Sequence, residues 1–575
     1  MVNNNISFMV GKSTALLLSA ICLNGIIIDN VYANSELYLI SENIKIAQNI
    51  NSSEIKVFCS TILKPQDIQE IVPELSIETE LLKLEANSTE IPAICPQVER
   101  VIIIKLAESN NFLTNRETIK DGIRQFYIEE GYINSLAILY GSRDILVEEG
   151  RVEVVVGGTG KLQKYVRDRI TPAANPFNTR KIEDQLRLLK SDPLIENIEA
   201  TLRPNEATNT PELFVNITAA NSLFGNIGID NYSPPSVGGE KLNLNLGYRN
   251  LTGIGDTFAI AYNPRLEAFD GTYNLGFNYQ APLNSMNGTL NLGVNIDRNE
   301  VVNGRFESLD IRGESETYSI SYRQPLVLTP REELALSIGF TYRDGQTFTF
   351  QGPTPFGQGP DEDGVSRTSV FNLGQEYTRR DPAGAWGFRS QFRVGVDIFD
   401  ATDNEVPNSQ GDYIPDGQFF SWLAQIQRVQ VLNDNNFLII QGDLQLTPHS
   451  LLPSEQFAIG GGQSIRGYRQ NARSGDNGIR FSIEDRITIA KNEAEEPIFV
   501  IAPFFNMGAV WNVENNPNQV PDKNFLAALG LGLLWQPAEG LNLRLDYAPP
   551  LIDLEDDQEY DIQDDGLHFS VNYSF

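Results

Sequence analysis

The sequence predicts a mainly β protein in which two small α+β domains precede an antiparallel transmembrane β-barrel of about 16 strands. Three observations lead to this prediction. Apolar and polar residues alternate through much of residues 221–575, and short connections alternate there with long ones. Beyond the amino-terminal segment, no run approaches the roughly 20 apolar residues of a transmembrane helix. Together these features indicate a protein that crosses a membrane with strands.

Residues 1–33 are typical of a secretory signal peptide. Lys12 supplies the positive charge, and residues 15–28 form a mainly apolar core. The segment ends at Ala33, a small residue of the kind that precedes a signal-peptide cleavage site. The core is too short to span a bilayer as a helix, although a retained membrane anchor is the alternative. We therefore expect an exported mature protein that begins with a short linker, residues 34–51.

Mixed helix and strand patterns follow, and they predict one α+β domain over residues 52–158 and a second over residues 159–220. In the first, Thr114 and Glu117 have capping-box spacing at the start of a helix. In the second, we expect a strand at Leu162–Val166 and a helix capped near Asn178. Residues 75–111 of the first domain are expected to be an insertion.

Residues 221–575 are expected to form the barrel. Leu242, Leu244 and Leu246, for example, alternate with asparagine and glycine. A period of two gives each strand one apolar and one wet face. Because an open sheet would leave unpaired edges in lipid, the strands must close into a cylinder. Five long connections are rich in Gly, Pro, Asn or Asp and are expected on the outer side: 297–313, 345–366, 398–416, 448–478 and 548–566.

Composition excludes several classes of function. The formal net charge of -31 argues against nucleic acid as a partner, because phosphate binding needs clustered Lys and Arg. The chain contains neither a Gly-x-Ser-x-Gly elbow nor a phosphate-binding Gly-x-x-x-x-Gly-Lys run, so we expect no enzymatic activity and no cofactor. Its two histidines, His449 and His568, lie far in sequence from Cys59 and Cys95, so we expect no metal site.

Cys59 and Cys95 are the cysteines that remain after removal of the signal peptide. An oxidising periplasm would permit a disulfide between them, but the sequence does not show whether their Cα atoms lie within reach. The sequence leaves this pairing open.

A glycine-dense loop is the most distinctive stretch of the barrel region. Three glycines at 460–462 precede Ile465-Arg466-Gly467-Tyr468, and such glycines allow tight backbone turns with positive φ. Arg466 is the fixed charge of the motif. A second motif, Phe504-Phe505-Asn506-Met507-Gly508, lies on a strand further along the chain.

These motifs resemble those of outer-membrane barrels that carry POTRA domains, and most closely the two-partner-secretion transporters of the haemolysin-secretion type. Gly131-Tyr132 followed by Ser135 also resembles the first POTRA domain of that family. The resemblance implies a loop folded into the barrel, whose arginine contacts the acid of a Phe-x-Asp-x-Gly motif on the wall. Asn506 stands at the position of that acid, between Phe504 and Gly508. Since an amide does not neutralise a guanidinium, we expect another carboxylate, Glu484, to complete the contact with Arg466.

The resemblance implies an outer-membrane transporter that binds an unfolded secreted polypeptide in the periplasm and passes it through the barrel. Alternatives are an assembly factor that inserts other barrels, and a passive solute channel. The final strand ends with the aromatic residues Tyr573 and Phe575, which resemble the signal read by the barrel assembly machinery. We expect the barrel to be surrounded by outer-membrane lipid and lipopolysaccharide.

Overall fold

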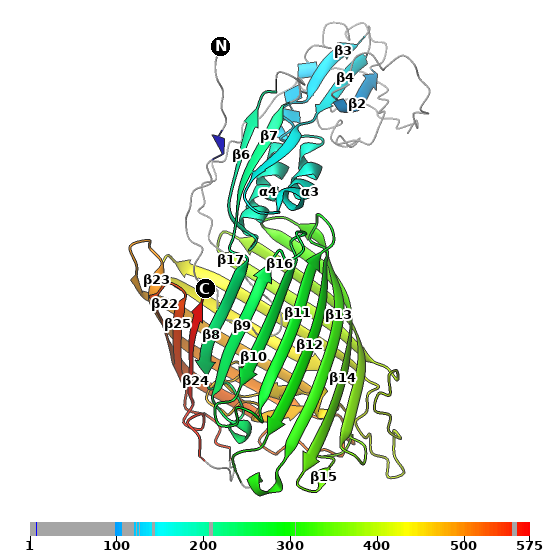
Figure 1. Cartoon of the computed structure of the whole chain (residues 1–575), viewed down its shortest axis with the longest axis vertical. Helices are drawn as coiled ribbons and strands as arrows, with labels where there is room; N and C mark the ends of the chain where they lie inside the picture. Colours follow the sequence, from blue (N-terminus) through cyan, green and yellow to red (C-terminus); the bar gives the residue numbers. More distant parts are fainter. Residues whose placement is uncertain are drawn as a thin grey trace, which may run out of the picture. The chain divides into compact units, whose positions relative to one another are not determined.

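The computed structural model describes residues 7–8, 98–105, 120–121, 124–125, 127–140, 144–205, 211–304, 306–554 and 560–575 (Figure 1). These residues fall in two compact units, of which the first ends at Ala220 and the second runs from Asn221 to Phe575. The linker at 34–51, Cys59, Cys95 and nearly all of the signal peptide lie outside the described residues. Among those residues, the structure has no helix with the length and apolar character needed to cross a bilayer.

The amino-terminal unit contains a four-stranded sheet with the order β1-β6-β7-β5, covered by two helices. Strand β5 runs parallel to β7, whereas the other neighbours are antiparallel. The core between helices and sheet is made of aliphatic side chains such as Val166, Ile170 and Val215, all fully buried. The elements are β1 (Ser7–Phe8), β5 (Glu153–Gly158), α3 (Gln163–Ala174), α4 (Thr179–Lys190), β6 (Ile195–Arg203) and β7 (Glu212–Ala219).

One expectation for this unit is wrong. Leu162–Val166 is not a strand, because Leu162 is the N-cap of α3 and Val166 and Ile170 are buried at helical spacing. Strand β5 falls within the range expected for the first domain, and it pairs with β7 in the sheet of this unit. The helix cap near Asn178 is present, since its Oδ1 accepts a hydrogen bond from Lys181 N at 3.0 Å.

A second, three-stranded antiparallel sheet has the order β2-β4-β3. Its strands are β2 (Val98–Lys105), β3 (Leu136–Tyr140) and β4 (Asp144–Gly150). Strand β2 lies in the segment 75–111 that we expected to be an insertion, and it pairs with β4 of this sheet. The continuous apolar run from Val101 to Ile104 suits a strand within a sheet.

The second unit is a closed antiparallel barrel of 16 long strands, which confirms the predicted fold class. The two-residue strand β15 (Gly352–Pro353) pairs only with the end of β14. The long strands are β8 (Leu223–Asp230), β9 (Lys241–Arg249), β10 (Thr257–Pro264), β11 (Tyr273–Pro282), β12 (Thr289–Glu300), β13 (Arg312–Leu328), β14 (Glu332–Thr349), β16 (Val365–Asp381), β17 (Gly384–Gly395), β18 (Phe420–Asn433), β19 (Asn436–Leu446), β22 (Asn477–Lys491), β23 (Pro497–Trp511), β24 (Phe525–Ala538), β25 (Leu541–Tyr547) and β26 (Leu567–Ser574).

The barrel closes where β26 pairs with β8, with Tyr573 opposite Ile227. Gly225 and Phe575 extend this seam through two mutual backbone hydrogen bonds of 3.0 Å. Tyr573 and Phe575 both remain about half exposed, and their rings stack with centroids 6.3 Å apart. The first and last strands of the barrel are therefore continuously paired, and the final aromatic side chains lie on its outer, apolar face.

Shorter and longer connections alternate around the barrel, as the sequence predicts. The longer ones are 231–240, 265–272, 301–311, 350–364, 396–419, 447–476, 512–524 and 548–566. They contain η1 (Pro235–Val237), η2 (Glu307–Leu309), η3 (Pro453–Glu455) and a two-stranded sheet of β20 (Phe457–Ile459) and β21 (Arg473–Gly475). The connection at 447–476, which we call the sixth loop, carries η3, β20, β21 and the Arg466 motif.

Candidate functional site

The sixth loop folds back against the inner face of the barrel. Ile465 and Tyr468 are buried in an apolar cluster with Phe504 of β23 and with Leu526 and Ala528 of β24. Arg466 between them is only 5% exposed. An arginine buried to this extent must be paired, so its partners define the site.

Two glycines make this path of the loop possible. Gly467 has a φ of +101°, and a Cβ there would lie 2.5 Å from the carbonyl oxygen of Ala548. Gly508 on β23 lies under the loop, where an added Cβ would come within 2.7 Å of the Ile465 side chain. The loop motif and the wall motif therefore meet where Ile465 packs over Gly508.

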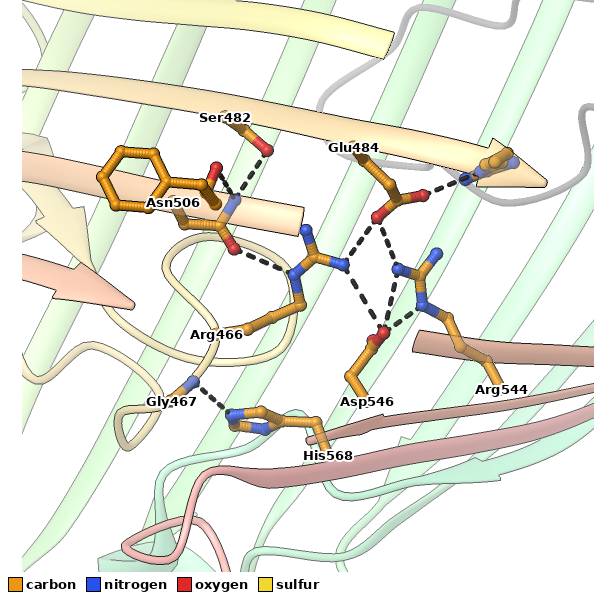
Figure 2. Close-up of polar contacts among 10 residues, drawn as sticks. Arg466, Gly467, Ser482, Glu484, Asn506, Arg544, Asp546 and His568 are labelled. Atoms are coloured by element: carbon orange, nitrogen blue, oxygen red, sulfur yellow. Dashed lines mark hydrogen bonds and ion pairs between the residues drawn. The ribbon is translucent and has the colours of Figure 1, made fainter. Parts of the chain in front are cut away.

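The Arg466 guanidinium contacts three strands of the wall (Figure 2). Its Nη1 lies 2.6 Å from Glu484 Oε2 on β22 and 3.5 Å from Asp546 Oδ1 on β25. Its Nε donates to Asn506 Oδ1 on β23 at 2.9 Å. The guanidinium carbon also lies 3.3 Å from the centre of the Phe504 ring, so one face of the cation is covered by an aromatic surface.

Glu484 and Asp546 serve wall arginines as well as the loop. Arg544 Nη2 donates to Glu484 Oε2 at 2.8 Å, and Arg544 Nε donates to Asp546 Oδ2 at 2.7 Å. Arg486 Nε donates to Glu484 Oε1 at 2.7 Å. Three guanidiniums thus share two carboxylates, which leaves one net positive charge. If Arg466 withdraws, Glu484 keeps Arg544 and Arg486, so the wall itself stays paired.

Asn506 fills the acid position with an amide that both accepts and donates. Its Oδ1 accepts from Arg466, while its Nδ2 donates to Ser482 Oγ at 2.6 Å. The side chain is fully buried. The amide therefore orients Arg466 without adding a negative charge.

The backbone and aromatic ring after Arg466 are also held. The Gly467 N–H donates to His568 Nε2 on β26 at 3.2 Å, so this nitrogen acts as an acceptor. The Tyr468 hydroxyl donates to Ala527 O at 2.8 Å and accepts from Ile552 N at 3.1 Å. Arg466 is therefore the centre of an attachment that involves β22 through β26.

A second attachment holds the other arm of the sixth loop. Glu455 of η3 is 6% exposed, pairs with Arg393 on β17 and accepts a hydrogen bond from Thr368 Oγ1 on β16 at 3.1 Å. Fully buried Asp476 closes the base of the loop, since its Oδ1 accepts from Leu451 N at 2.9 Å and its Oδ2 accepts from Val513 N at 3.0 Å. The loop is thus tied to two separate parts of the wall.

The site found in the structure contains residues that the sequence predicts and others that it does not. Arg466, Glu484 and Asn506 lie together, whereas the sequence analysis did not place Asp546 or His568 in this group. Both had one available signal, because they occupy the inward, polar positions of the last two strands. Glu455 and Arg393 had no such signal. Within the described residues, no group of three or more His, Cys, Asp or Glu is arranged to hold a metal ion.

Comparisons with known proteins identify a matching family and several similar proteins. The family described as haemolysin secretion/activation protein ShlB/FhaC/HecB matches residues 212–534. The outer membrane transporter CdiB of Escherichia coli is 22% identical over 384 residues, which are 64% of this chain and 62% of that protein. The corresponding protein of Dickeya dadantii is 23% identical over 393 residues, which are 66% of this chain and 67% of that protein. The chain therefore aligns with somewhat less than two thirds of the Escherichia coli relative.

Two solved structures share the fold. CdiB from Escherichia coli superimposes with a TM-score of 0.66 at 16% identity and covers 91% of this chain and 90% of that chain. CdiB from Acinetobacter baumannii gives a TM-score of 0.62 at 16% identity, with coverages of 92% and 91%. At this level of identity, the likeness shows a common fold.

Proposed function

Because this chain belongs to the haemolysin secretion/activation protein family ShlB/FhaC/HecB, we propose that it is an outer-membrane translocator of two-partner secretion. It binds an unfolded secreted polypeptide with its periplasmic domains and passes it through the barrel to the cell surface. The observation that carries this proposal is the sixth loop, which is buried against the inner wall through Arg466. A movable segment held inside a closed barrel suits a protein that must open for a client and reseal.

We assign the signal peptide to residues 1–33, the linker to 34–51, two POTRA domains to 52–220 and the barrel to 221–575. The boundary between the POTRA domains is better placed near residue 151 than at 158, because β5 pairs with β7. Among the described residues, β5 stands at the end of the strand order of its sheet, so we propose its outer edge as the place where an extended client segment binds. Binding by β-augmentation uses main-chain hydrogen bonds and therefore tolerates many client sequences.

The resting state has the loop attached at Arg466. When the loop moves, the buried guanidinium of Arg466 leaves the cluster and becomes hydrated, while Arg544 and Arg486 continue to pair with Glu484. The cost of release is thus limited to the loop's own contacts. We take Tyr573 and Phe575 as the assembly signal. Both side chains are about half exposed on the outer face of the barrel, where we expect lipid as their neighbour.

A secretome comparison tests the proposal. We expect deletion of the gene to remove one large secreted protein from the culture medium and complementation to restore it, with the other outer-membrane barrels present at normal levels. Loss of many barrels with an unchanged set of secreted proteins would instead identify an insertase. Unchanged barrels and secreted proteins would contradict both functions.

A further inference from the structure

On one side of the barrel several inward side chains are exposed, whereas the described wall beneath the sixth loop is buried. Glu484, Asn506 and Asp546 are at most 6% exposed. In contrast, Asn245, Asn278, Asn295 and Ser319 are exposed, and they come from β9, β11, β12 and β13. In the strand order β11 and β22 stand half a ring apart, and Figure 1 shows β9 to β13 side by side.

The register of β9 to β13 places these exposed residues in two neighbouring rows. The first row runs across β9 to β13 as Asn245, Ala261, Gly276, Asn295 and Thr317, and it ends beside Arg343 on β14. The second row runs as Ala259, Asn278, Gly293, Ser319 and, on β14, Thr341. We call these two rows the amide strip. The residues that follow strip residues in sequence, such as Leu246 after Asn245 and Ile320 after Ser319, are large, apolar and exposed, as lipid-facing residues are.

The amide strip contains no charged residue, and every side chain in it is small, an amide or a hydroxyl. Other parts of the inner wall carry ion pairs. Arg323 pairs with Glu333 and Glu376 at 2.7 Å, and Arg480 pairs with Asp443 at 2.6 Å. The polar contacts of the sixth loop described above go to β16, β17 and β22 through β26. The strip is therefore chemically distinct and lies away from the loop's attachments.

We propose that the secreted polypeptide passes along the amide strip. This inference rests on the proposed function and specifies the client's route. An unfolded chain presents backbone amides and side chains of both charges, and it must bind weakly enough at each point to move on. Amide and hydroxyl groups can donate hydrogen bonds to any backbone and accept them from it, whereas each fixed charge of the wall would retain client residues of the opposite charge. Glycine and alanine project little or nothing into the lumen, which leaves room for client side chains of any size.

Site-specific photocrosslinking tests the route in the full-length protein in cells. The client is stalled by a stably folded module at its last-emerging end, and a photoreactive residue replaces Asn278 or Ser319. The matched control replaces Gln441, an inward residue of β19 beside the Asp443 ion pair. We expect client crosslinks at Asn278 and Ser319 to exceed those at Gln441 several-fold. Equal or stronger crosslinking at Gln441 would overturn the strip but leave translocation intact, whereas no crosslink at any of the three positions would contradict the lumen route itself.

A charge placed on the strip provides a second readout. We expect Ser319→Lys to slow secretion several-fold more than Ser319→Asn, which keeps the strip neutral. Gln441→Lys, outside the strip, should leave the rate near that of the natural protein. Surface amounts of the barrel, measured in the same cells, separate slow transport from poor assembly. Equal secretion by Ser319→Lys and Ser319→Asn would contradict the proposal.

Discussion

Arg466 and Arg544 donate to the same oxygen, Oε2 of Glu484, at 2.6 and 2.8 Å. One arginine belongs to the sixth loop and the other to strand β25 of the wall. Glu484 is therefore a shared acceptor, satisfied by the wall alone and by wall and loop together. If the loop is released, as we propose, Glu484 would still pair with Arg544 and Arg486, so no buried carboxylate would be left unpaired, which would be costly.

Glu484→Gln is expected to be more damaging to the barrel than loss of Arg466. The change leaves three guanidiniums with Asp546 as the remaining carboxylate of the cluster, and unpairing buried charge costs about 3–5 kcal/mol. Urea unfolding of the detergent-solubilised barrel, followed by its gel mobility without heating, measures the effect. Arg466→Ala is the matched comparison, and equal midpoints for the two variants would contradict the shared-acceptor account.

Asn506→Asp is expected to hold the loop more tightly. A carboxylate there would add a third negative charge and bring the cluster from one net positive charge to neutrality, directly beside Arg466 Nε. Single-channel conductance in planar bilayers should show fewer or shorter openings, and client secretion should slow. Asn506→Ala, which removes the hydrogen bond without adding charge, should change conductance in the opposite direction. More frequent openings in Asn506→Asp would count against this reading.

The outer loops are expected to be sensitive to pH through Asp416, which lies in the 396–419 connection beside Leu451 of the sixth loop. Burial, with a smaller contribution from Asp403, raises the pKa of Asp416 to about 6. The folded loop thus binds this proton more tightly than the unfolded chain does. Its stabilising contribution is complete below the ordinary carboxyl pKa near 4 and is lost as the pH rises through about 6.

Limited proteolysis of the outer loops at pH 5 and pH 8 measures this contribution. Cleavage should be faster at pH 8 in the natural protein. Asp416→Asn imitates the protonated form, so cleavage of this variant should differ less between the two pH values. An unchanged pH dependence in Asp416→Asn would assign the effect to other groups.

A disulfide across the seam separates a lumen route from lateral opening. Asn226 on β8 and Ser574 on β26 are directly opposite, and Asn226 Nδ2 lies 3.3 Å from Ser574 Oγ. The double variant Asn226→Cys, Ser574→Cys is expected to secrete its client equally well with the disulfide formed or reduced. Each single variant controls for the substitutions. Secretion that requires reductant would mean that the seam must open.

Much of the barrel was predictable because its physics is local. Each strand has to present apolar side chains to lipid and polar ones to the lumen. Neighbouring residues such as Leu246 and Asn245 therefore differ in polarity, and the sequence shows this directly. The secondary structure of the α+β unit is harder to predict from the sequence. Leu162–Val166 is too short for its apolar pattern to distinguish a strand from the start of a helix, and only contacts across the unit decide it.

The site was predictable only where a motif marked it. Arg466 and Glu484 stand 18 residues apart, so the next strand after the loop was a natural place to seek a carboxylate. Asp546 and His568 join the loop from 80 and 101 residues away. Such contacts depend on barrel closure and strand register, which adjacent residues do not encode. The Glu455 and Arg393 pair needs the same global information.

The central claim is that Arg466 holds the sixth loop inside the barrel at rest and that this attachment serves secretion. Its most direct test is the secretion rate of the client in Arg466→Ala cells, with barrel amount and heat-modifiable mobility measured in the same membranes and Arg466→Lys as the control that keeps charge but loses the planar fork. We predict normal assembly, a marked loss of secretion in Arg466→Ala and an intermediate rate in Arg466→Lys. Normal secretion by a correctly assembled Arg466→Ala barrel would contradict the claim.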